Sequence, residues 1–252
     1  MLECEEYIRN FFMLIRAVLF DLDNTLTHRD QSIWAYSHYL AAYYQPLLFE
    51  ADPQQIKCIV NRIDNGGYPD IQLLTHPSIG ASVAYALLQE LSWHEQPDFE
   101  ELTQFWFRHF GSHAVAMTGA LELLRHLKQA QYKLAIVSNG SHATRLNILQ
   151  GLGFSHFFDA IISSESAGVS KPKPEIFLYA SERLGLEPEE CLFIGDHPIN
   201  DVQGALGAGM QAVLLDGFHA DKEHAVNTKR IQKLDQLWKY LSSDYGRTDD
   251  IE

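Results

Sequence analysis

The sequence predicts an α/β fold in which an open parallel sheet carries helices on both faces and an all-α domain is inserted into the chain. Short, continuous apolar runs alternate with segments of helical spacing, as in parallel strands joined by right-handed crossover helices. Between residues 30 and 113 only helical patterns occur. The 252 residues, 46% of them hydrophobic, are enough for one large domain or two moderate ones.

Five apolar runs are predicted to be the strands of the sheet. Each run is continuous rather than alternating, which suits a strand that is covered on both faces. The predicted strands are Ile15–Phe20, Lys133–Val137, Ala160–Ile162, Cys191–Ile194 and Gln211–Leu215.

Helical spacing lies between the later strands, and proline and glycine mark its ends. Leu121–Leu127 and Leu146–Leu149 each show helical spacing of apolar residues, and Ala205–Ala208 gives a third, shorter pattern. A further helix is expected to begin at Pro174 and to end at Gly185, because proline favours the first turn and glycine the position after the last.

The inserted region is rich in aromatic residues, most of which we assign to its packing core rather than to a ligand site. We place this helical domain at 30–113, the α/β core domain at 13–29 and 114–241, an N-terminal extension at 1–12 and an acidic tail at 242–252. The helices expected in the insertion are Ser32–Tyr44, Pro53–Ile63, Ser78–Leu91 and Pro97–Phe110.

Composition narrows the partners and the compartment. The formal net charge of −14 disfavours nucleic acid and anionic membranes as partners. Three cysteines without metal-ligand spacing indicate a reducing, cytoplasmic location, and Cys191 is expected to be a buried thiol. We expect no export signal, because the N-terminus is acidic, and no membrane segment, because the apolar run ending at Phe20 is too short. Met13 could serve as an alternative start.

The first predicted strand ends in two aspartates, Asp21 and Asp23. Because side chains repeat every two residues along a strand, both carboxylates point to the same side. Two anions this close repel each other, and a divalent cation is the usual compensation. The pair therefore predicts the mouth of an active site.

Polar residues also follow the other predicted strands. Ser138 and Asn139 follow the second strand, Lys171 lies beyond the third, and Asp196 and Asp201 follow the fourth. In an open parallel sheet, ligands bind at the carboxyl ends of the strands. We therefore expect these residues to form one site suited to a phosphate group and a metal ion.

These residues fall within four segments that resemble, in order, the motifs of the haloacid dehalogenase superfamily of hydrolases. The resemblance covers residues 14–215. It implies a Rossmann-like core, with a helical cap domain inserted between the first and second motifs. The four segments are Asp21–Thr27, Ile136–Asn139, Lys171–Phe177 and Gly195–Asp201.

The resemblance implies how the acidic residues act. Asp21 would be the nucleophile that accepts a phosphoryl group, and Asp23 the general acid and then the general base. Mg²⁺ would bind Asp21, the main-chain carbonyl of Asp23 and Asp196.

The resemblance also assigns the phosphate contacts. Ser138 and the main-chain amide of Asn139 would hold phosphoryl oxygens, and Lys171 would neutralise charge that develops in the transition state. Asp201 would orient Lys171 or a metal-bound water. His197 is expected to have a structural or supporting role.

The predicted function is a Mg²⁺-dependent phosphatase that hydrolyses a small phosphorylated metabolite through an aspartyl-phosphate. Asp23 disfavours the alternative of a 2-haloacid dehalogenase, because a departing halide needs no acid. A phosphomutase and a catalytically silent phosphate-binding module are further alternatives. Nucleoside monophosphates, sugar phosphates, phosphoglycolate and flavin mononucleotide all stay open as substrates, and the sequence does not define an oligomeric state.

Overall fold

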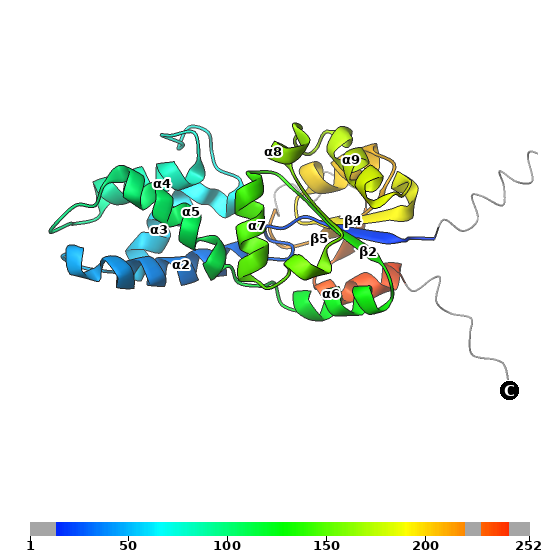
Figure 1. Cartoon of the computed structure of the whole chain (residues 1–252), viewed down its shortest axis with the longest axis horizontal. Coiled ribbons are helices and arrows are strands. Elements are labelled where there is room, and N and C mark those ends of the chain that lie inside the picture. Colours follow the sequence, from blue (N-terminus) through cyan, green and yellow to red (C-terminus); the bar gives the residue numbers. More distant parts are fainter. Residues whose placement is uncertain (1–13, 220–227, 242–252) are drawn as a thin grey trace, which may run out of the picture. The chain divides into compact units, whose positions relative to one another are not determined.

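The structure, a computed structural model, describes residues 14–219 and 228–241, and it divides the chain into two compact units (Figure 1). An α/β unit comprises 14–25, 118–142, 157–219 and 228–241, and a helical unit comprises 26–117 and 143–156. The expected extension at 1–12, the alternative start Met13 and the acidic tail at 242–252 lie outside the described residues. The domain boundaries expected from the sequence stay a prediction.

A parallel sheet of six strands forms the centre of the α/β unit. The strand order is β3-β2-β1-β4-β5-β6, so β1 lies between β2 and β4. The strands are β1 (Ala17–Phe20), β2 (Lys133–Ser138), β3 (Ala160–Ser163), β4 (Cys191–Gly195), β5 (Gln211–Leu215) and β6 (Lys229–Ile231).

The predicted α/β fold is confirmed, and each predicted apolar run matches a strand to within two residues at either end. All residues of β1 and β4 are buried, as continuous apolarity requires. Strand β6 was not predicted, because Lys229 and Arg230 leave it without an apolar run, and it is held at the sheet edge by pairing with β5. Cys191 is buried, and burial raises the pKa of its thiol to about 12.

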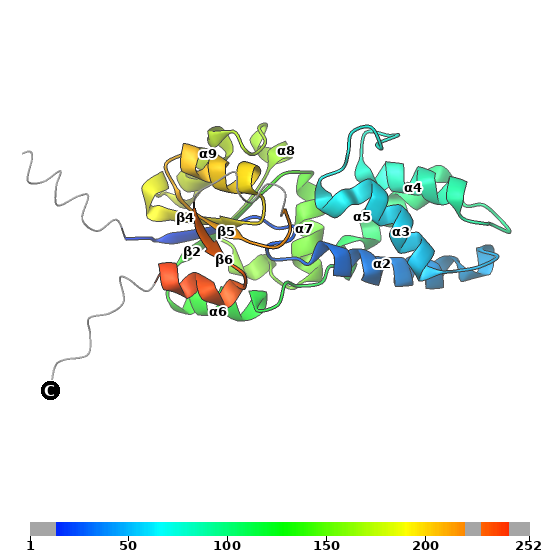
Figure 2. The same cartoon turned by 180° about the vertical axis from the view of Figure 1, so that it is seen from behind.

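Helices cover both faces of the sheet. Figures 1 and 2 show α8 (Ser164–Ala167) and α9 (Pro174–Leu184) on one face and α6 (Ala120–Gln129) on the other. Helix α9 has Pro174 in its first turn and Gly185 in a left-handed cap, as predicted. No helix among residues 14–219 and 228–241 is long and apolar enough to cross a bilayer.

The helical unit contains four helices close to those predicted, together with most of α7 (His142–Gly151). The predicted starts at Ser78 and Pro97 shift inward, because the side chains of Ser78 and Asp98 accept hydrogen bonds from the first turn and so act as caps. The helices are α2 (Arg29–Tyr44), α3 (Pro53–Asp64), α4 (Ile79–Glu90) and α5 (Phe99–His109).

Aromatic side chains form much of the core of the helical unit. Tyr36 and Trp106 are buried, with their ring centroids 5.1 Å apart in an edge-to-face arrangement. The expectation that these aromatics pack in the core is therefore confirmed for the buried ones, such as Tyr36 and Trp106. The exposed exceptions are Trp34, Tyr43, Phe49 and Tyr85, with 37%, 56%, 67% and 41% of their surface exposed.

A buried ion pair joins two helices of this unit. The Arg29 guanidinium donates from Nη2 and Nε to the two Asp64 oxygens at 2.5 and 3.1 Å, and both side chains are at least 95% buried. Asp64 Oδ2 also accepts the backbone N–H of Gly67, which fixes the turn after α3. Such a pair costs desolvation to form, and loss of one partner leaves an uncompensated buried charge.

Arg29→Met should therefore lower the free energy of unfolding by about 3–5 kcal/mol. The matched control is Arg62→Met, which breaks the exposed pair with Glu90 and should cost about 0–1 kcal/mol. Denaturant titration followed by tryptophan fluorescence measures both, because Trp34, Trp93 and Trp106 lie in the helical unit. Equal losses for the two variants would contradict this account.

Candidate active site

The carboxyl edge of the sheet gathers the predicted site residues of the α/β unit. Strand β1 pairs in register with β2 and β4, so the residues after these strands lie at one edge. The backbone N–H of Asp21 continues the pairing and donates to the carbonyl of Ile194 at 2.9 Å. The predicted site residues that are buried at this edge are Asp21, Asp23, Ser138, Lys171, Asp196 and Asp201.

Lys171 lies between two carboxylates. Its Nζ donates to Asp21 Oδ1 and to Asp201 Oδ1, each at 2.6 Å, and all three side chains are at least 96% buried. Charged partners in a dry setting make strong, short hydrogen bonds and fix each other's geometry. The Lys171 ammonium is thus fixed beside Asp21 in the interior of the unit.

Asn139 holds the main chain of Lys171. Its amide oxygen accepts the Lys171 N–H at 2.8 Å, and its amide nitrogen donates to the Lys171 carbonyl at 3.1 Å. Two hydrogen bonds to one residue fix both the position and the orientation of its backbone. The side chain of Asn139 therefore acts on the site through Lys171, in addition to the phosphate contact predicted for its main-chain amide.

Residues between β4 and Asp201 hold the Asp201 side chain in place. Its Oδ2 accepts the backbone N–H of His197 at 2.9 Å. The His197 ring accepts the N–H groups of Ile199 and Asn200 through Nδ1, and so begins the helical turn that carries Asp201. Gly195 has no side chain, and a Cβ added at this position would lie 2.3 Å from Asp201 Oδ2.

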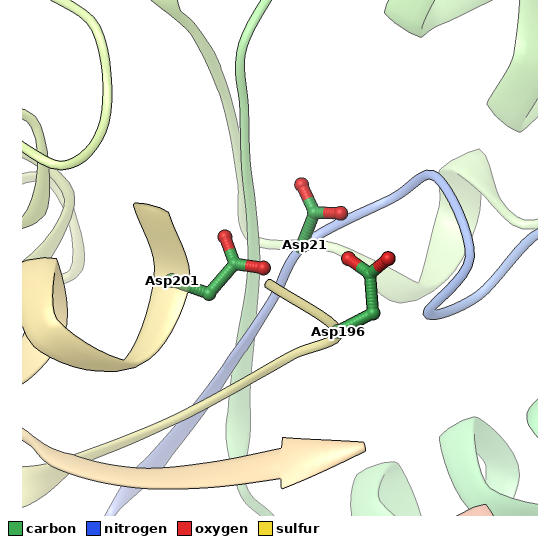
Figure 3. A group of neighbouring side chains, drawn as sticks. All are labelled: Asp21, Asp196 and Asp201. Atoms are coloured by element: carbon green, nitrogen blue, oxygen red, sulfur yellow. The ribbon is translucent and has the colours of Figure 1, made fainter. Parts of the chain in front are cut away.

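Three carboxylates converge on a shared space (Figure 3). One oxygen from each of Asp21, Asp196 and Asp201 lies within 4.8 Å of the others, and all three residues are buried. This group includes the Asp201 carboxylate, which was not among the expected metal ligands. The expected ligand from Asp23 is its main-chain carbonyl, which stays a prediction.

Burial and mutual repulsion shape the protonation of the site. Burial raises the pKa of Asp21 to about 8 against the pull of Lys171, and the neighbouring carboxylates add to the rise. Burial also raises the pKa of Asp196 to about 6, against a hydrogen bond from His219. Burial alone would lower the pKa of Lys171, but Asp201 and Asp21 outweigh it and the pKa lies above its usual value. One ammonium does not neutralise this many acids.

The donor set fits a hard divalent cation. Asp21 Oδ2 is buried and accepts no hydrogen bond from the described part of the chain. A buried carboxylate oxygen without a donor is unfavourable, and a bound cation satisfies it. The three converging groups are all carboxylates. Mg²⁺ prefers oxygen ligands such as carboxylates, whereas thiolates select softer metals.

His219 was not among the residues predicted from the sequence. Its Nε2 lies 3.1 Å from Asp196 Oδ2. It follows β5 outside the four motif segments, and its spacing to the other histidines carries no signal. Its position could have indicated it, because β5 pairs beside β4 and the residues after both strands reach the same edge.

Gly195→Ala should displace the Asp201 carboxylate, because the new Cβ would lie 2.3 Å from its Oδ2. Overpacking of this kind lowers the free energy of unfolding by about 1–3 kcal/mol. Gly207→Ala is the control, since a Cβ at position 207 meets nothing within 4 Å, and it should be neutral or slightly stabilising. Denaturant titration compares the two, and a neutral Gly195→Ala would show that the close approach is not required.

Comparison with known proteins agrees with this geometry. A family model described as haloacid dehalogenase-like hydrolase matches residues 15–209. A glyceraldehyde 3-phosphate phosphatase from Methanopyrus kandleri is 41% identical over 101 residues, which are 40% of this chain and 43% of that protein. A phosphoserine phosphatase from Thermus thermophilus is 34% identical over 106 residues, 42% of this chain and 43% of that protein. The matches thus span less than half the length of these two relatives.

Solved structures extend the likeness to nearly the whole chain. YfnB of Bacillus subtilis, described as a HAD hydrolase bound to magnesium, aligns with a TM-score of 0.64 and 27% identity. The alignment covers 91% of this chain and 99% of that one. With the family model matched over 15–209 and all four motif segments present, the chain belongs to the family of haloacid dehalogenase-like hydrolases.

Proposed function

We propose that the protein is a Mg²⁺-dependent phosphatase that hydrolyses a small phosphomonoester through an aspartyl-phosphate on Asp21. The observation that carries the proposal is the state of Asp21 at the centre of the sheet edge. One of its oxygens is paired with Lys171 at 2.6 Å, while the other is buried and has no hydrogen-bond donor among residues 14–219 and 228–241. Such a carboxylate is oriented and partly neutralised, and its second oxygen faces the space that the cation and the substrate would share rather than a donor of the described chain.

Asp21 would attack phosphorus in line with the leaving oxygen, forming an oxygen–phosphorus bond as the ester bond breaks. Asp23 would donate its proton to the leaving alkoxide. It would then take a proton from the water that attacks the phosphoryl group, and Asp21 would be released. The two roles suit Asp23, because it lies two residues beyond the nucleophile and is largely buried.

The remaining residues would bind the phosphoryl group. Ser138 and the main-chain amide of Asn139 would donate to its oxygens, and Lys171 would offset the charge that develops in the transition state. Asp201 would keep the Lys171 ammonium in place, since it accepts one of its hydrogen bonds at 2.6 Å. Lys171 would thus reach the phosphate from a fixed position.

The carboxylates of Asp21 and Asp196 and the main-chain carbonyl of Asp23 would hold Mg²⁺, and the nearby Asp201 carboxylate adds negative charge to the site. Bound Mg²⁺ would screen the repulsion between Asp21 and the incoming phosphate. This fits a site in which buried acids outnumber the single ammonium of Lys171.

The substrate is proposed to be a small phosphorylated metabolite. Two relatives are named as phosphatases of glyceraldehyde 3-phosphate and of phosphoserine, which makes these compounds the first members of a test panel. The net charge of −14 disfavours nucleic acid as a substrate. All the residues assigned to the chemistry lie in the α/β unit.

Asp21→Asn should abolish phosphate release, because an amide is not a comparable nucleophile. Asp235→Asn, which neutralises an exposed aspartate of the same unit, is the control and should keep wild-type turnover. Phosphate release from the panel measures both variants. Turnover of Asp21→Asn near the wild-type rate would remove Asp21 as the nucleophile.

Asp23→Asn should lower kcat by about 100- to 10,000-fold, the usual contribution of general acid–base catalysis. KM should change far less, because Asp23 is assigned to proton transfer rather than to binding. Steady-state kinetics with the best panel member separate the two parameters. A change confined to KM would contradict the acid–base role.

Chelation and pH test the metal. EDTA should abolish turnover, whereas activity that survives EDTA would favour the dehalogenase alternative.

The folded-state pKa values of Asp21 and Asp196 lie near 8 and 6, above the ordinary 3.8. The stability that their protonation contributes is therefore present below about pH 4 and is lost as pH rises through these values.

Mg²⁺ needs ionised carboxylates, so binding competes with protons. Mg²⁺ should therefore raise the Tm more at pH 8 than at pH 6. Thermal unfolding with Mg²⁺ and with a sodium salt of equal ionic strength measures the difference. An equal Mg²⁺ effect at the two pH values would contradict the proposed competition.

A further inference from the structure

His219 contacts the acidic cluster from outside the segment that defines the family. It lies beyond residues 15–209, which the family model matches. Its Nε2 lies 3.1 Å from Asp196 Oδ2, and its side chain is 14% exposed, whereas that of Asp196 is fully buried. An ionised carboxylate can only accept, so the contact requires Nε2 of His219 to carry the proton and donate it.

The loop that carries His219 is anchored where it leaves the sheet. The Asp216 N–H donates to the Ile231 carbonyl of β6 at 2.9 Å, and Arg230 pairs with Asp216 Oδ1 at 2.7 Å. Gly217 then adopts a φ of 118°, which residues with a side chain rarely adopt. The unpredicted edge strand β6 thus fixes the start of this loop.

The His219 ring also packs on a fixed neighbour. Its centroid is 4.5 Å from that of His197. His197 accepts two backbone N–H groups through Nδ1, so its ring is held by the turn that carries Asp201. Two histidines therefore support two of the three converging carboxylates.

We propose that His219 is a positioning residue for the divalent cation of this site, acting through Asp196. By donating to Oδ2, it would fix the rotation of the Asp196 carboxylate and so the direction in which that carboxylate meets the ion. A single-oxygen contact suits Mg²⁺, which demands near-octahedral geometry and keeps several waters. Hydrogen bonds to metal-binding carboxylates orient them and commonly strengthen metal binding. The inference rests on the proposed metal-dependent function.

The test is Mg²⁺ binding by isothermal titration calorimetry on the full chain without substrate. His219→Ala should weaken Mg²⁺ binding by about 10- to 100-fold, the usual effect of removing such a partner. His219→Gln keeps an N–H donor and should stay within about threefold of wild type. His126→Ala, which removes an exposed histidine from α6, is the control and should leave affinity unchanged.

The outcomes separate this inference from the proposed function. Wild-type affinity in His219→Ala would overturn the inference and leave the phosphatase proposal standing. Equal weakening in His219→Ala and His219→Gln would also overturn it, because the hydrogen bond would then not be what matters. No binding of millimolar Mg²⁺ by the wild type would overturn the metal-dependent function itself. Thermal unfolding in EDTA confirms that each variant is folded.

Discussion

The ammonium of Lys171, held between Asp21 and Asp201, is the interaction on which the rest of the site depends. At 2.6 Å from each carboxylate, it is the positive charge within hydrogen-bond distance of Asp21 in the described structure. Removing it would leave buried acids facing one another, at the large cost of uncompensated buried charge. Even with it, burial keeps the pKa of Asp21 near 8. The site therefore favours additional positive charge, from a proton or from a bound cation.

The fold brings these charged groups together from the ends of several strands rather than from one local sequence motif. Asp21 directly follows β1 at the centre of the sheet, Asp196 directly follows the neighbouring β4, and the helical turn after β4 carries Asp201 (Figure 3). The absence of a side chain at Gly195 permits the close approach of Asp201. Asn139, after β2, fixes the backbone of Lys171 by two hydrogen bonds. Each supporting contact comes from a different stretch of the sequence.

What the sequence could predict follows from the range of the forces involved. Strands such as Cys191–Gly195 were predictable, because burial on both faces leaves a continuous apolar run. Helix ends at Pro174 and Gly185 were predictable from local backbone preferences. Strand β6 was not, because pairing with its neighbour rather than apolarity holds it.

The contacts of the site show the same limit. The sequence placed Asp21, Lys171 and Asp201 at one edge, but the charges that Lys171 joins depend on tertiary packing. The Asp64 partner of Arg29 and the Asp196 partner of His219 are likewise contacts between distant residues. Neither has a sequence signature at short range.

The most direct test of the central claim is to find the phosphoryl group on the protein. Turnover of the best substrate with Mg²⁺ is quenched in acid, and peptides from the wild type and from Asp23→Asn are analysed by mass spectrometry. We expect the added mass of one phosphoryl group on Asp21, with more of it in Asp23→Asn if hydrolysis slows more than transfer. A phosphoryl group on another residue, or full turnover with none on Asp21, would contradict it.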